Sequence, residues 1–150
     1  MTAFQSLNVS ASALTAQRVR MDVVSSNLAN MDTTRAKQVN GEWVPYRRKM
    51  VSLQSKGESF SSILNSQMSG SGHAGNGVKV SKITEDKSDF NLVYDPTDPD
   101  ANAEGYVQKP NVDPLKEMVD LVSSTRSYEA NVTAMNATKG MLMKALEIGK

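Results

Sequence analysis

The sequence predicts a mainly α-helical protein, with long N- and C-terminal helices packed as a coiled-coil-like hairpin or bundle and a small β-rich insert between them. Apolar residues recur every seven positions near both ends of the chain, which is the spacing of coiled-coil helices. The middle instead carries short stretches of alternating apolar and polar residues bounded by glycine and proline, which is typical of strands and turns. We therefore expect residues 1–31 and 113–150 to form a helical inner assembly domain and residues 32–112 to form the insert.

The N-terminal helix is expected to run from Phe4 to about Asn30, because no proline or glycine interrupts this stretch. At 1.5 Å per residue it would be about 40 Å long. A companion stripe begins at Phe4 and Ala11 and turns polar at Arg18 and Ser25. The seven-residue apolar series consists of Leu7, Leu14, Met21 and Leu28.

The C-terminal helix is expected to run from Pro114 to about Glu147, a length of roughly 50 Å. Asp113 is placed to cap it, and Pro114 suits the first helical turn. Its seven-residue series consists of Leu121, Tyr128, Met135 and Leu142. The companion series consists of Met118, Thr125, Val132, Lys139 and Leu146. A further face, formed by Ala130, Ala134, Ala137 and Ala145, would let a second helix approach closely.

Two cations interrupt these apolar stripes, Arg18 in the first helix and Lys139 in the second. One interpretation is that their long side chains reach solvent. The other is that they fix the register or the choice of partner, as polar residues in a helical seam can. The sequence leaves both interpretations open.

The insert is expected to hold short strands joined by turns. The stretch Ser59–Asn65 suits a short helical turn, and the glycine- and serine-rich stretch Ser66–Gly77 suits a flexible surface loop. Asp95–Asp100 predicts a turn, because its two prolines fix φ and its aspartates bond locally. The strand-like stretches are 42–53, 77–83, 91–94 and 105–107.

So small an insert cannot cover both faces of two long helices. The chain has 39% hydrophobic and only 5% aromatic residues, so its own core is modest. Either the helices form a self-contained hairpin, or they also bury surface between subunits. We favour the second interpretation, because each helix carries a heptad repeat.

Residues for catalysis or cofactor binding are not evident. The chain has no cysteine, and its one histidine, His73, lies in a glycine-rich stretch that would not hold a catalytic base in place. Asp95, Asp98 and Asp100 lack the spacing of a calcium-binding loop. The sequence therefore predicts no enzyme, cofactor or metal. The net charge of +1 argues against a nucleic-acid partner, and the absence of a long apolar run argues against a membrane span. No signal-peptide pattern is present at the N-terminus.

The string Ser25-Ser26-Asn27-Leu28-Ala29-Asn30, which closes the N-terminal helix, resembles a signature of the flagellar rod, hook and hook-cap axial proteins. It continues as Met31-Asp32-Thr33-Thr34, without the glycine and aromatic residue common in the distal-rod and hook members. Further strings in the same order resemble the proximal rod proteins of the bacterial flagellar basal body: Gly77-Val78-Lys79-Val80, Leu92-Val93-Tyr94-Asp95-Pro96, Gly105-Tyr106-Val107, Pro110-Asn111-Val112-Asp113 and Arg126-Ser127-Tyr128-Glu129-Ala130-Asn131.

This resemblance implies a structural subunit of the proximal rod that transmits torque and forms part of the export channel wall. It implies export without a cleaved signal peptide through the flagellar export apparatus, and assembly at the basal body in the periplasm. The implied partners are copies of the chain, other proximal rod proteins of the FlgB and FlgF types, a FliE-type adaptor and a distal rod protein of the FlgG type. We expect the assembly interface to include Leu7, Leu14, Met21, Asn27, Leu28, Ala29, Asn30, Met118, Leu121, Tyr128, Asn131, Val132, Met135 and Leu142.

The alternative function is that of a soluble cytoplasmic coiled-coil adaptor or regulator. Such a protein would keep the two helices, but it would need neither the β-rich insert nor the strings around Gly105 and Pro110.

Overall fold

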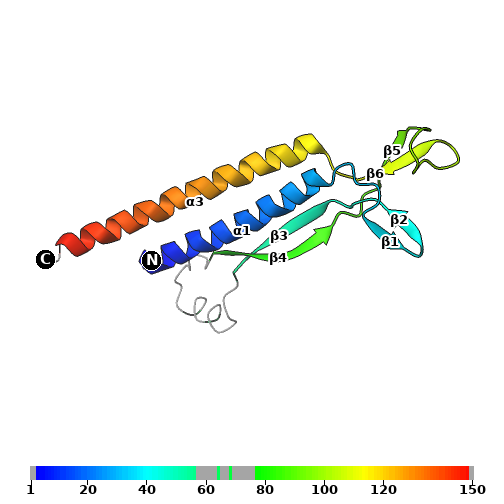
Figure 1. Ribbon diagram of the computed structural model, residues 1–150. Coiled ribbons are helices and arrows are strands. Elements are labelled where there is room, and N and C mark those ends of the chain that lie inside the picture. Colours follow the sequence, from blue (N-terminus) through cyan, green and yellow to red (C-terminus); the bar gives the residue numbers. More distant parts are fainter. Residues whose placement is uncertain (1–2, 57–63, 65–67, 69–76, 149–150) are drawn as a thin grey trace. The chain divides into compact units, whose positions relative to one another are not determined.

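A computed structural model describes residues 3–56, 64, 68 and 77–148 of the chain (Figure 1). Two long helices enclose the strands in the order of the sequence. They are α1 (Ala3–Ala29) and α3 (Pro114–Ile148). The strands are β1 (Lys37–Val39), β2 (Glu42–Val44), β3 (Lys49–Ser55), β4 (Val78–Glu85), β5 (Asn91–Tyr94) and β6 (Tyr106–Lys109). The predicted order of a helix, short strands and a second helix is confirmed. The predicted helical turn at 59–65, the glycine-rich loop and His73 fall outside the described residues, apart from Leu64, Met68 and Gly77.

The predicted helix ends are confirmed by their hydrogen bonds. The Asp113 carboxylate accepts from the backbone N–H groups of Leu115 at 3.0 Å and Lys116 at 3.3 Å, which satisfies two free donors of the first turn of α3. At the end of α1 the Asn30 side-chain amide donates to the Ser26 carbonyl at 2.8 Å. A polar side chain therefore marks each of these ends.

The strands form three separate two-stranded pairs, β1–β2, β3–β4 and β5–β6. In the β5–β6 pair, which is antiparallel, Asn91 lies opposite Lys109 and Tyr94 opposite Tyr106. The β3–β4 pair ends at a hydrogen bond from Lys56 N–H to the Gly77 carbonyl (2.8 Å). The stretch 42–53, expected to be extended, contains β2 and most of β3, and the residues from Pro45 to Arg48 separate the two strands.

The β1–β2 hairpin was not predicted, although its turn has a strong sequence signal. Asn40 and Gly41 both have positive φ, 54° and 91°, as the tightest hairpin turns require. Lys37 pairs with Val44 and Val39 with Glu42, so only these two residues lie in the turn.

Two glycines from the recognised strings permit close packing at positive φ. A Cβ on Gly105, whose φ is 82°, would lie 2.9 Å from the Tyr94 ring. A Cβ on Gly77, whose φ is 97°, would overlap the Ser12 side chain. The Ser12 hydroxyl instead accepts from Val78 N–H at 3.1 Å, which fixes the start of β4 against α1.

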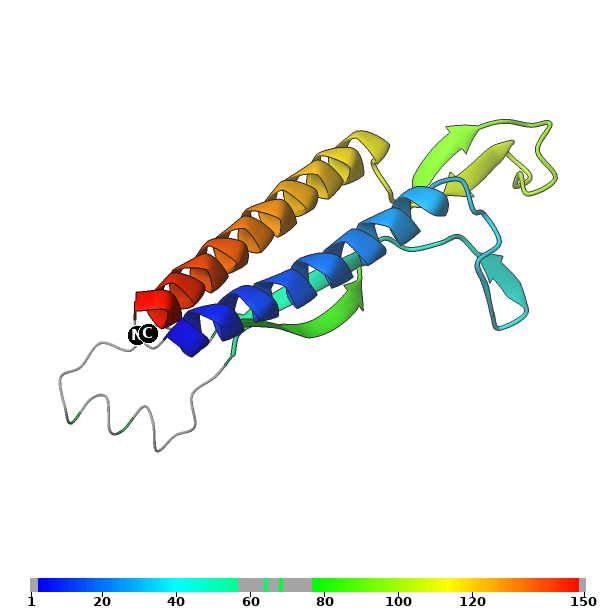
Figure 2. The ribbon, with the colours of Figure 1, turned by 60° about the vertical axis from the view of Figure 1, so that its left-hand side comes forward.

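The chain divides into two compact units, and each contains part of both helices. The first comprises residues 1–20, 52–82 and 124–150, and the second comprises residues 21–51 and 83–123. Within each unit a stretch of α1 lies beside a stretch of α3 and runs in the opposite direction (Figures 1 and 2). The expected division into an assembly domain and an insert depends on contacts with neighbouring subunits, and it stays a prediction.

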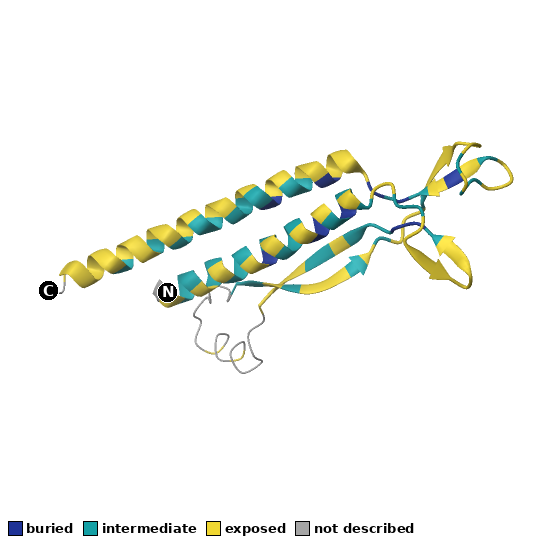
Figure 3. Cartoon of the chain, in the orientation of Figure 1, coloured by how far each residue is buried: buried dark blue, intermediate teal, exposed yellow. Residues whose placement is uncertain are grey.

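The core is small. Its buried apolar residues are Ala16, Val23, Val24, Tyr46, Val107 and Val112. Three polar side chains, those of Asn27, Glu117 and Ser124, are buried as completely (Figure 3). In the part of the chain that the structure describes, no helix is apolar enough over a sufficient length to cross a membrane.

Candidate assembly surfaces

Helix α3 has one covered side along its length, and its residues follow the alternating three- and four-residue spacing of a coiled-coil seam. The predicted series Leu121, Tyr128, Met135 and Leu142 lies on this side and is half-buried. The second series of the seam is polar and consists of Glu117, Ser124, Asn131 and Thr138. The covered side of α3 therefore alternates apolar and polar layers.

The predicted companion series lies one residue further round the helix from the seam, and three of its five members are exposed within the chain, so its role between subunits stays a prediction. Met118 is 51% exposed and Leu146 is 70% exposed, while Val132 is half-buried. The seam instead contains the polar residue that precedes each member of that series. The alanine-rich face of Ala130, Ala134, Ala137 and Ala145 is also exposed.

Helix α1 is covered on most of its surface. The predicted series Leu7, Leu14, Met21 and Leu28 is half-buried. The other predicted stripe faces solvent along its whole length, and Phe4 alone is 72% exposed. The residues of this exposed stripe are Phe4, Asn8, Ala11, Thr15, Arg18, Asp22, Ser25 and Ala29.

Asn27, from the signature string, is fully buried at 0% exposure, and every polar atom of its amide has a partner. Its oxygen accepts from Lys49 N–H at 2.8 Å and from the Tyr46 hydroxyl at 3.0 Å. Its nitrogen donates to the Lys49 carbonyl at 2.9 Å and to the Glu117 carboxylate at 3.0 Å. Four bonds saturate an amide side chain. Asn27 therefore ties the end of α1 to β3 and to the first turns of α3 within its own chain.

Glu117 and Arg48 form an ion pair next to this amide. Arg48 Nε donates to Glu117 Oε1 at 2.5 Å, and its side chain is only 14% exposed. The other guanidinium nitrogens lie 3.9 Å from Asp86 and 3.6 Å from Asp120. The Glu117 carboxylate is fully buried, and its bonds to Arg48 and Asn27 offset the cost of burying it. We call Asn27, Tyr46, Arg48 and Glu117 the polar junction.

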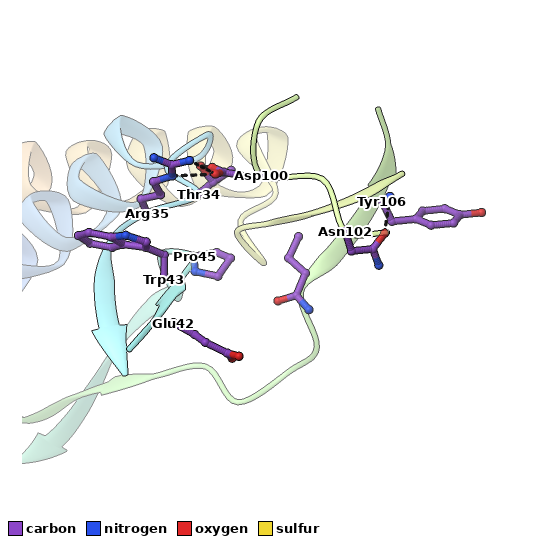
Figure 4. Close-up of a pocket in the computed structure, with 9 residues that line it drawn as sticks. Thr34, Arg35, Glu42, Trp43, Pro45, Asp100, Asn102 and Tyr106 are labelled. Atoms are coloured by element: carbon purple, nitrogen blue, oxygen red, sulfur yellow. Dashed lines mark hydrogen bonds and ion pairs between the residues drawn. The ribbon is translucent and has the colours of Figure 1, made fainter. Parts of the chain in front are cut away.

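The ends of the hairpins carry exposed aromatic side chains beside a polar pocket of about 380 Å³. Arg35 forms an ion pair with Asp100 at the pocket wall, and the Thr34 hydroxyl donates to the same carboxylate at 2.7 Å (Figure 4). These hydrogen bonds, with the charge of Arg35, lower the pKa of Asp100. The Tyr106 ring points away from the pocket (Figure 4) and makes an edge contact with Tyr94.

Two aspartates of the predicted turn bond locally, as expected, whereas the Asp100 carboxylate is held by Thr34 and Arg35. Asp95 Oδ1 accepts from the backbone and hydroxyl of Thr97 at 3.1 and 2.7 Å, and Asp98 accepts from Asp100 N–H at 2.9 Å. The bonds from Thr97 also lower the pKa of Asp95. Across the described residues, no group of three histidine, cysteine, aspartate or glutamate side chains is placed to hold a metal.

Comparison with known proteins matches both ends of the chain to flagellar families. The model for flagella basal body rod proteins matches residues 7–37, and the model for the C-terminal part of flagellar basal body rod FlgEFG proteins matches residues 103–148. The flagellar basal-body rod protein FlgC of Bacillus subtilis is 98% identical over 150 residues, which is 100% of both chains. The chain belongs to the FlgC family of flagellar basal-body rod proteins.

More distant FlgC proteins align over nearly the same span. The one from Borreliella burgdorferi is 40% identical over 97% of this chain and 96% of its own. The one from Salmonella typhimurium is 38% identical over 95% of each chain. The resemblance to rod proteins is thus confirmed, and the FlgC family is one of structural rod subunits of the flagellar basal body rather than of enzymes.

Proposed function

We propose that this rod subunit polymerises through the exposed sides of its two helices, packing against copies of itself and against other rod proteins. The observation that carries the proposal is the number of large apolar side chains that α3 leaves uncovered. They are Leu115, Met118, Val119, Val122, Met141, Met143, Leu146 and Ile148. Extended apolar surface of this kind marks interaction sites in soluble proteins.

The expected interface residues divide into two groups under this proposal. Ala29 and Met118 are exposed and free to contact a neighbour. The half-buried residues are Leu7, Leu14, Met21, Leu28, Asn30, Leu121, Tyr128, Asn131, Val132, Met135 and Leu142. These residues would pack within the chain, and the part of each side chain that stays exposed would contact a neighbour. Asn27 would act only within its chain, because the polar junction uses all of its bonds.

The finer features of the proposal rest on the resemblance to proximal rod proteins. The subunit would pass through the flagellar export apparatus without a cleaved signal peptide and assemble in the periplasm. Its neighbours would be FlgB- and FlgF-type proximal rod proteins, a FliE-type adaptor and an FlgG-type distal rod protein. Long helices packed side by side would transmit torque, because they spread the load over many small dispersion contacts, and they would form part of the export channel wall.

The test is to follow a tagged chain in cells that lack the untagged protein. We expect it in purified basal bodies, and we expect it to be retained in the cytoplasm of cells without a flagellar export apparatus. A cytoplasmic adaptor would show the same location in both strains and would be absent from basal bodies, which would reject the proposal.

A further inference from the structure

The exposed stripe of α1 is narrow and carries two charges of opposite sign. Arg18 and Asp22 lie one turn apart on it, between small residues such as Ala11 and Ala29. Both side chains point away from the covered part of the helix. Among the described residues, neither Arg18 nor Asp22 has an ion-pair partner within the chain.

Helix α3 also has an exposed stripe, which lies on the side opposite its seam (Figure 3). With 3.6 residues per turn, Arg126 lies roughly 180° round the helix from Met135. The stripe consists of Leu115, Val119, Val122, Arg126, Glu129, Ala130, Thr133, Ala137 and Gly140. Its two charged members, Arg126 and Glu129, are also without an ion-pair partner in the part of the chain described here.

We propose that the exposed stripe of α1 in one copy packs antiparallel against the exposed stripe of α3 in a second copy. The register is set by two ion pairs, Asp22 with Arg126 and Arg18 with Glu129. This inference rests on the proposed polymerisation and names the surfaces that carry it.

The same register places small residues of α1 opposite exposed residues of α3. Counting outward from the Asp22–Arg126 pair, Ala29 lies opposite Val119 and Ala11 lies opposite Ala137. At the far end Phe4 lies within a turn of Met141, and these two are among the most exposed apolar side chains of their helices. Alanine at 11 and 29 thus lets the α1 stripe approach α3 closely, and Phe4 adds an apolar contact near Met141.

Only the antiparallel direction satisfies both ion pairs. In a parallel alignment that joins Asp22 to Arg126, Arg18 would lie opposite Val122 and Glu129 would lie opposite Ser25. Within each unit of the chain, α1 and α3 already run in opposite directions. Copies related by rotation about an axis along the helices would therefore present α1 antiparallel to the α3 of the neighbour. Such a contact joins two different surfaces and repeats from copy to copy, as a ring or rod requires.

The decisive experiment reverses the charges in the full chain, expressed in cells that lack the wild-type copy. Asp22→Arg and Arg126→Asp, each alone, place like charges opposite one another. We expect each to be exported but to reduce the number of basal bodies containing the chain by about tenfold, since like charges at a contact disfavour it strongly. The double variant Asp22→Arg with Arg126→Asp should recover to within about twofold of wild type. Two single variants that assemble normally, or a double variant that is no better than either, would overturn the proposal.

A cross-linking arm reports the geometry directly, because the natural chain has no cysteine. Ala11→Cys combined with Ala137→Cys should give disulfide-linked multimers of this chain in oxidised basal bodies. The control combines Ala11→Cys with Lys139→Cys, which is exposed but lies roughly 160° round the helix from Ala137. Equal linking of both pairs, no linking, or a link to a protein of another mass would each reject the contact between copies. Absence of the wild-type chain from basal bodies would instead reject the proposed function on which the inference rests.

Discussion

Helices α1 and α3 carry the same seven-residue apolar repeat, yet they differ in how much of their surface is covered. Helix α1 leaves one narrow stripe exposed, while α3 has one covered seam and a broad exposed side. The repeat therefore shows that each helix has a partner, but it does not show how many sides are covered. That number depends on elements far away in the sequence, such as β4, which approaches α1 at Ser12.

The largest effect is expected where the end of α1 and the start of α3 share the polar junction. Arg48→Ala leaves the Glu117 carboxylate buried beside Asn27 without its counter-charge. We expect the free energy of unfolding to fall by about 3–5 kcal/mol, measured by urea denaturation of the purified chain.

The matched control replaces the whole ion pair, in Arg48→Met with Glu117→Met. Because no charge is then left buried, this double variant should lie within about 1 kcal/mol of wild type. A double variant that is as unstable as Arg48→Ala would show that the pair itself, rather than the orphaned charge, supplies the stability.

The contrast between the two sides of α3 gives the next largest effect. Met135→Asp puts a charge into the half-buried seam and should lower the free energy of unfolding by about 3 kcal/mol. Val119→Asp lies on the exposed side, roughly 160° round the helix from Met135, and should change it by less than about 0.5 kcal/mol. The second variant should nevertheless be depleted from basal bodies. Similar losses of stability for both would show that the exposed side of α3 is covered within the chain in solution.

Within α1, two asparagines allow a buried position, Asn27, to be compared with an exposed one, Asn8. Asn27→Ala removes four hydrogen bonds and leaves buried donors and acceptors unpaired, so a loss of about 2 kcal/mol is expected. Asn8→Ala, on the exposed stripe, should stay within about 0.5 kcal/mol of wild type. Thermal unfolding followed by circular dichroism measures both. Equal effects would mean that α1 is not enclosed as the structure describes.

The smallest effect concerns Gly140, whose added Cβ would meet nothing within 4 Å in the chain. Gly140→Ala should raise the free energy of unfolding by up to about 1 kcal/mol, because alanine favours the helix. Hydrogen exchange across the last turns of α3 would detect the gain. If exchange slows but assembly in cells weakens, the exposed stripe is packed closely by a neighbour. An unchanged exchange rate would show that helix propensity at Gly140 does not set the stability of the last turns of α3.

Local signals predicted the helices and most strands well. Asp113, Pro114 and the apolar repeats are read from neighbouring residues, and the structure keeps both helices within one residue of the expected ends. The Asn40–Gly41 turn could have been predicted in the same way, since this pair is the preferred sequence of a tight hairpin.

The polar junction could not be predicted from local signals. Asn27 meets Glu117 across 90 residues and Lys49 across 22, and no periodicity links these positions. The second series of the α3 seam could not be predicted for a related reason. Its second series is polar, at Glu117, Ser124, Asn131 and Thr138, so a search for apolar repeats selected the neighbouring residues instead.

The bond between Asn27 and Glu117 also constrains when the subunit can finish folding. Contacts between residues so distant in sequence form late, because a long loop must close before they stabilise anything. During synthesis, which starts at the N-terminus, α1 is complete long before the carboxylate that its buried amide requires. Until that carboxylate is in place, the Asn27 amide and the backbone of β3 beside it stay accessible to water. The polar junction can therefore form only after the chain has been made as far as Glu117.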